Sequence, residues 1–178
     1  QEVIWATAMP LLPKCAGLGQ PNTLVIRVYR HEFGIGPEPA HYAGKLFLPK
    51  QEAHITVLGS TAGSRLSQQF DHDSGIERKV RQAFEDTDWH YEKTSDMRHL
   101  VRQQTNDGDV EESIIMLVRM DGMTVFYKRL MALGLMPADH PVPPAHVTLY
   151  THNCDPGIGV HSDAELAELT RGKIEHLA

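Results

Sequence analysis

The chain has 178 residues, of which 41% are hydrophobic and 22% charged, as is typical of a globular protein. No apolar run approaches the roughly 18 residues that a membrane-spanning helix needs, so we expect no membrane partner. The formal net charge of −6 argues against an extended nucleic-acid surface, because such binding depends on neutralising phosphates. A small anionic substrate in a locally positive pocket is compatible with this charge.

The first 22 residues are rich in proline and glycine and show little periodicity, so we expect an irregular N-terminal arm at 1–22. The chain begins at Gln1 and not at Met, which indicates a processed or truncated N-terminus. No redox or zinc motif surrounds Cys15 or Cys154. We therefore expect free thiols, with one bridge between them as the alternative, and the cytoplasm as the compartment.

Short runs rich in β-branched and aromatic residues predict strands in the first half of the chain. These runs are residues 23–30, 45–48 and 54–58. Glycines and prolines between residues 31 and 41 predict a loop. A helix is predicted from about residue 75 to 85, because Ser74 and Glu77 form a capping-box pattern at its start.

The second half continues with a predicted strand at residues 88–93 and a turn at 106–109. The nearly continuous apolar run 113–120 predicts a strand buried on both faces. Residues 123–133 have helical spacing, 146–151 predict a strand, and 162–169 predict a helix that opens with a second capping box. Strands and helices without strict alternation indicate an α+β fold, with 23–178 as a single domain.

Two segments share one pattern, Ala53–Val57 (AHITV) and Ala145–Leu149 (AHVTL). Each places His-x-Thr within an apolar strand. One such triplet is uninformative in a chain with 11 histidines. Two triplets with apolar flanks have a chance probability on the order of one in a thousand. The pair is therefore informative where a single motif is not.

Strand geometry explains why this spacing suits catalysis. Side chains alternate between faces, so His54 and Thr56 project together, as do His146 and Thr148. Hydrolysis of a phosphodiester requires a base for the attacking oxygen and an acid for the leaving oxygen, and histidine can be either near neutral pH. Threonine hydroxyls can donate hydrogen bonds to the non-bridging oxygens. This chemistry requires no metal.

The paired motif resembles the two-histidine (2H) phosphoesterase superfamily, the LigT-like or cyclic phosphodiesterase group, over residues 23–151. The resemblance implies a bilobal fold, with two similar lobes of antiparallel sheet and flanking helices around a central cleft. It implies catalytic roles for His54 and His146, phosphate-binding roles for Thr56 and Thr148, and no cofactor or metal. It also implies a small nucleotide or RNA-end substrate, with 2′,3′-cyclic phosphates as the leading class.

Three further residues are candidates for substrate binding. Tyr150 is expected on the strand face of His146 and Thr148, although packing at the strand end would explain it equally well. Arg27 and Tyr29 share the polar face of the first predicted strand, which an ordinary solvent-exposed face would also explain.

Four cations, Lys45, Lys50, Arg119 and Lys128, could approach a phosphate, but solvent exposure is the simpler interpretation for each. Two groups do not have the spacing of a metal site: residues 71–73, and the histidines His140, His146 and His152. The glycines at 157 and 159 lack the rest of a dinucleotide-binding fingerprint. Two other functions stay open. One is a catalytically silent nucleotide- or RNA-end-binding module on the same scaffold, and the other is a metal hydrolase.

Overall fold

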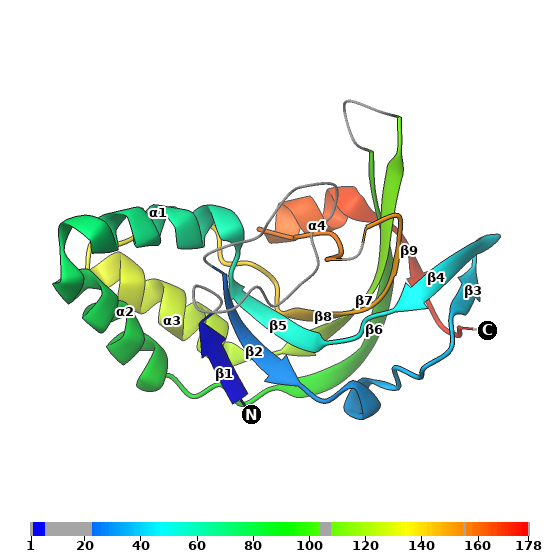
Figure 1. Ribbon diagram of the computed structural model, residues 1–178, viewed down its shortest axis with the longest axis horizontal. Helices are drawn as coiled ribbons and strands as arrows, with labels where there is room; N and C mark the ends of the chain where they lie inside the picture. Colours follow the sequence, from blue (N-terminus) through cyan, green and yellow to red (C-terminus); the bar gives the residue numbers. More distant parts are fainter. Residues whose placement is uncertain (1, 6–22, 104–107, 155, 178) are drawn as a thin grey trace.

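The computed structural model describes residues 2–5, 23–103, 108–154 and 156–177 (Figure 1). Its strands are β1 (Glu2–Trp5), β2 (Leu24–Val28), β3 (Ala40–Tyr42), β4 (Lys45–Pro49), β5 (Ala53–Leu58), β6 (Glu92–Gln103), β7 (Val110–Arg119), β8 (His146–His152) and β9 (Thr170–Ile174). Its helices are α1 (Ser60–His72), α2 (Ser74–Glu85), α3 (Asp121–Ala132), α4 (Asp163–Leu169) and the short 3-10 helix η1 (Arg30–Phe33).

The strands form one continuous sheet in the order β1-β2-β5-β8-β7-β6-β9, and β4 adds to β8 and carries β3. Every pairing among the described residues is antiparallel. The predicted α+β class is therefore confirmed. The pairing of β5 with β8 joins the half of the sheet that contains the first His-x-Thr motif to the half that contains the second.

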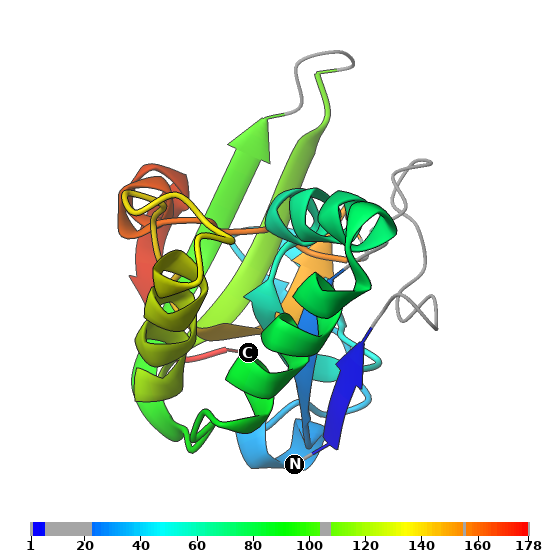
Figure 2. The ribbon, with the colours of Figure 1, turned by 90° about the vertical axis from the view of Figure 1, so that its left-hand side faces the viewer.

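Neighbouring residues of β7 show that both faces of the sheet are covered. Ile114 belongs to the main core, which includes buried residues of α1, α2 and α3. Ile115, on the opposite face, belongs to a smaller cluster with Ile158, Val160 and Leu166 of α4. The three longer helices lie together on one side of the molecule, and α4 lies beside β9 (Figure 2).

Local chemistry explains two of the helix starts. Asp73 caps α2, since its carboxylate accepts a hydrogen bond from the backbone N–H of Gly75 at 2.8 Å. The helix therefore begins one residue earlier than predicted, with Ser74 inside it. At the start of α3, a β-carbon on Gly122 would lie 2.2 Å from the carbonyl oxygen of Asp88. Only glycine allows α3 to pack so closely against the segment that precedes β6.

Several predicted boundaries need correction. The strand predicted at residues 88–93 is β6, which starts only at Glu92 and extends to Gln103. Helix α1 lies where no helix was predicted. The expected irregular arm is wrong for β1, which pairs with β2, and residues 6–22 lie outside the described part of the chain. The predicted turn at 106–109 also lies partly outside it.

Candidate functional site

The two His-x-Thr segments lie on adjacent strands at the centre of the sheet. Strands β5 and β8 are antiparallel, and Ile55 is the direct partner of Val147. Both of these side chains are fully buried in the main core. This register places the histidine of each strand beside the threonine of the other. All four side chains lie on the face of the sheet opposite to Ile55 and Val147. We call this group the His–Thr cluster: His54, Thr56, His146 and Thr148, all partly buried. The two motif strands therefore lie side by side.

Strand β7 borders the cluster on one side. His146 pairs with Leu117, and Thr148 pairs with Ile115. Ile115 is buried in the smaller hydrophobic cluster and Leu117 packs against it. The His–Thr cluster therefore shares its face of the sheet with α4 and the segment that leads to it.

His54 lies in a positively charged setting. It is the cross-strand partner of Arg27 on β2. Removal of the ring from water lowers the pKa of His54 from its ordinary value of 6.5 to about 4. The charges of Lys50, His146 and Arg27 act in the same direction on this pKa. His54 is therefore neutral near pH 7 and has a nitrogen lone pair that can accept a proton.

His146 has a different setting. Its ring Nδ1 lies 3.0 Å from the carbonyl oxygen of Pro144. A carbonyl only accepts, so Nδ1 carries a proton and Nε2 is the nitrogen that can exchange one. Burial lowers the pKa of His146, and the charge of His161 lowers it further, but the hydrogen bond to Pro144 acts in the opposite direction. Of the two rings, His146 therefore has the partner that favours its protonated form.

Lys50 corrects the expectation that the candidate cations are solvent-exposed. Its residue is only 3% exposed, and its charge acts on His54. The other three fit the simpler interpretation, because Lys45, Arg119 and Lys128 are all exposed. Lys45 and Arg119 also form ion pairs with carboxylates. Part of the positive charge at His54 thus comes from a buried lysine that the sequence did not distinguish from the other candidate cations.

Tyr150 does not join the His–Thr cluster. In the ladder between β7 and β8, Ile115 pairs with Thr148 but Ile114 pairs with Tyr150, so Leu149 is an extra residue in β8. This bulge changes the face to which the following side chains point. Tyr150 is buried in the main core, and the expectation that it shares the face of Thr148 is wrong.

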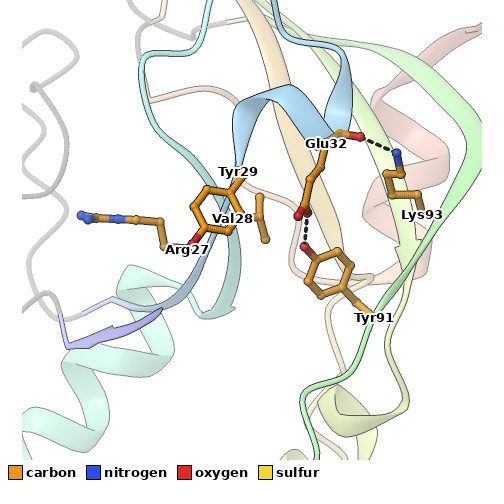
Figure 3. Close-up of a pocket in the computed structure, with 6 residues that line it drawn as sticks. All are labelled: Arg27, Val28, Tyr29, Glu32, Tyr91 and Lys93. Atoms are coloured by element: carbon orange, nitrogen blue, oxygen red, sulfur yellow. Dashed lines mark hydrogen bonds between the residues drawn. The ribbon is translucent and has the colours of Figure 1, made fainter. Parts of the chain in front are cut away.

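A pocket of about 390 Å³ opens at the end of β2 (Figure 3). The Tyr91 hydroxyl donates to the Glu32 carboxylate there at 2.8 Å, and burial and this bond raise the pKa of Tyr91 to about 12. Tyr29 is 62% exposed. The Arg27 guanidinium points away from Tyr91 and Lys93 (Figure 3). The pocket is lined by Arg27, Val28, Tyr29, Glu32, Tyr91 and Lys93. Since Arg27 also neighbours His54, this side chain connects the pocket to the His–Thr cluster.

The segment after β8 packs directly against the second motif. Gly157 has a φ of +85°, and a β-carbon there would lie 2.9 Å from Thr148 Cγ2. The N–H of the next residue, Ile158, donates to the Ser113 hydroxyl at 3.0 Å and so anchors the turn. Gly157 thus allows a close approach of this turn to Thr148.

Cys154, at the start of the same segment, is disulfide-bonded, so the expected free thiol is wrong for this residue. Cys15, the other cysteine of the chain, lies outside the described residues. Disulfides persist mainly in oxidising compartments. This bond therefore does not support the cytoplasmic expectation.

Sequence reasoning named Lys50 but not its burial, and it missed the contact of Gly157 with Thr148 and the hydrogen-bonded pair of His161 and Glu165. The only sequence signal for the pair is its four-residue spacing, with His161 one residue before the predicted capping box of Ser162 and Glu165.

Within the described residues, no group of three or more histidine, cysteine or acidic side chains is arranged to hold a metal ion. None of the described helices is long and apolar enough to cross a membrane.

Comparison of the chain with protein-family models, with curated proteins and with solved structures finds no match.

Proposed function

We propose that this protein is a metal-independent phosphodiesterase that hydrolyses a small cyclic nucleotide or oligonucleotide by two-histidine acid–base catalysis. The observation that carries the proposal is the pairing of Ile55 with Val147, which places both His-x-Thr segments on one face of adjacent strands. The resemblance to two-histidine phosphoesterases makes 2′,3′-cyclic phosphates the leading substrate class. In this proposal each half of the sheet, corresponding to one lobe, supplies one motif.

The different settings of the histidines support separate roles. In the proposed reaction, neutral His54 takes a proton from water as the water oxygen attacks phosphorus. The bond from phosphorus to one ribose oxygen breaks, and His146 gives its Nε2 proton to that oxygen. The carbonyl of Pro144 holds the other ring nitrogen and so keeps Nε2 directed away from it. The product is a phosphomonoester. His54 then loses the proton it gained and His146 regains the one it gave, so both rings return to their starting states.

The threonines and the nearby cations support the same assignment. Thr56 and Thr148 each lie beside a histidine of the other strand, so their hydroxyls can donate to the non-bridging oxygens. The charge of Lys50 near His54 offsets the negative charge that builds on the phosphoryl group, and it is effective because it is buried. An anionic substrate also counteracts the positive field that lowers the pKa of His54.

The pocket at the end of β2 is the proposed site for the nucleobase. Its volume of about 390 Å³ lies within the usual range for small-ligand sites. The ring of Tyr29 stacks on His31 with its centroid 5.6 Å away, but the residue is largely exposed, so its other face can stack on a base. Arg27 lines this pocket and is also the cross-strand partner of His54, which would place base and phosphate close together.

The test is turnover of 2′,3′-cyclic nucleotides followed by phosphorus NMR, which also assigns the position of the product phosphate. His54→Ala and His146→Ala should each lower kcat by about 10²–10⁴-fold, as is usual for a lost general acid or base. His72→Ala, an exposed histidine at the far end of α1, is the matched control and should keep full activity.

Three outcomes separate the alternatives. Binding of the cyclic nucleotide without ring opening would identify a silent binding module. Activity that disappears with a strong chelator and returns with a divalent ion would identify a metal hydrolase. Near-normal turnover in either alanine variant would refute the two-histidine mechanism.

A further inference from the structure

His161 lies between the Gly157 turn and α4, and its ring reaches toward both motif strands. A β-carbon at Gly59, the residue after β5, would lie 3.7 Å from His161 Nε2. The charge of His161 also acts on His146 at the start of β8. Because β5 ends where antiparallel β8 begins, the ring lies at the Thr56 and His146 end of the His–Thr cluster.

Glu165 fixes the orientation of this ring. Its Oε2 accepts from the backbone N–H of His161 at 2.7 Å and from ring Nδ1 at 2.9 Å. The carboxylate is an acceptor, so Nδ1 carries a proton and Nε2 faces away from it. Ser162 caps α4 by accepting from the Glu165 N–H at 3.0 Å. The carboxylate therefore holds the histidine and does not close the reciprocal half of the predicted capping box.

The Nε2 edge of His161 is open to a ligand. The side chain is 53% exposed. Glycines flank this edge, and β-carbons at Gly59 and Gly159 would stand 3.7 and 3.9 Å from Nε2. Larger side chains at these two positions would cover the nitrogen. The ring is thus held at one nitrogen and accessible at the other.

We propose that His161, oriented by Glu165 and protonated on both ring nitrogens, is a third phosphate-contacting residue that donates from Nε2–H to a non-bridging oxygen of the substrate. This inference rests on the proposed function, because it adds a contact to the same anion. It places a directional donor at the end of the His–Thr cluster opposite the end where Lys50 and Arg27 act on His54. The phosphate would then be held from both ends, which restricts its rotation relative to the histidines.

The test measures kcat and KM on a 2′,3′-cyclic nucleotide and, separately, the Kd of inorganic phosphate by calorimetry. His161→Phe keeps a ring but removes both nitrogens, and it should raise KM and the phosphate Kd about 10- to 100-fold with little change in kcat. Glu165→Ala releases the ring and should raise KM and the phosphate Kd about three- to tenfold. Glu165→Gln keeps an acceptor for Nδ1–H, so both constants should stay close to those of the wild type. His72→Phe is the matched control and should change neither constant.

Unchanged KM and phosphate Kd in His161→Phe would overturn the inference, as would a loss of kcat with unchanged binding. If the wild type does not open the cyclic phosphate, the proposed function fails, yet the phosphate Kd still decides this inference. If urea denaturation shows that His161→Phe does not fold, the two Glu165 variants decide. Equal phosphate affinities of Glu165→Ala and Glu165→Gln would then refute an oriented donor.

Discussion

Substitution of His54 by glutamine should remove an acid-sensitive part of the protein's stability. The unfolded chain takes up a proton at this residue near pH 6.5, whereas the folded chain does so only at about pH 4. As the pH falls through this window, the unfolded state binds more protons, so the free energy of unfolding decreases. Above pH 6.5 both states are neutral at His54, and the residue contributes no pH dependence.

The size of the effect follows from the two pKa values of His54, 6.5 and about 4. Their difference corresponds to about 3.4 kcal/mol once the pH is below both, and to about 2 kcal/mol at pH 5. We therefore expect the wild type to lose about 2 kcal/mol of unfolding free energy between pH 7 and pH 5 that His54→Gln does not lose.

The assay is urea denaturation at pH 7, 6 and 5, followed by tryptophan fluorescence, since Trp89 is buried and packs against Phe84. The unfolding free energies of wild type and His54→Gln are compared at each pH, with His72→Gln as a surface control. Parallel pH dependence of wild type and His54→Gln, within about 0.5 kcal/mol, would refute the positively charged, water-poor setting inferred for this ring.

Other expectations concern the rest of the site. Thr56→Val and Thr148→Val should each lose about 1.5–3 kcal/mol of transition-state stabilisation, measured as kcat/KM, and normal turnover in both would reduce them to strand formers. Gly157→Ala should lower kcat/KM about 10- to 100-fold, because the new methyl group displaces Thr148, and unchanged kinetics would contradict that contact. The dependence of kcat/KM on pH should be bell-shaped with its acid limb near pH 4, reported by neutral His54, and a flat profile would exclude the acid–base pair.

The motif strands were predictable because both signals are local. Alternation of apolar and polar residues over Ala53–Leu58 and His146–Thr148 already divides each strand into a buried apolar face and a partly buried polar face. The buried Ile55 and Val147 match that division. Their direct pairing is a long-range contact that the sequence could only suggest through the repetition of the motif.

Helix α1 was missed because its sequence, STAGSRLSQQFDH, is polar and contains glycine and several serines. Its apolar positions, Ala62, Leu66 and Phe70, recur every four residues but are too few to stand out. Packing against the main core supplies what helix propensity lacks. Tertiary contacts therefore decide this element.

Two features of the site could not be predicted from the residue pattern of the sequence. The burial of Lys50 depends on what surrounds it in the folded chain, and neighbouring lysines look the same in sequence. The position of Tyr150 depends on the bulge at Leu149, which exists only because β7 pairs on both sides of an extra residue. Both arise from contacts between strands distant in the chain.

The bulge in β8 has a consequence for how robust the chemistry is to mutation. Before it, Val147 enters the main core, and after it Tyr150 does, so the strand is anchored in that core on both sides of the extra residue. Sliding β8 by one position would bury His146 and expose Val147, a costly exchange. Hydrophobic packing thus fixes the position of the His–Thr cluster along the strand. Natural variants that keep the core volumes should preserve the alignment of His54, Thr56, His146 and Thr148 even where the surface has diverged completely.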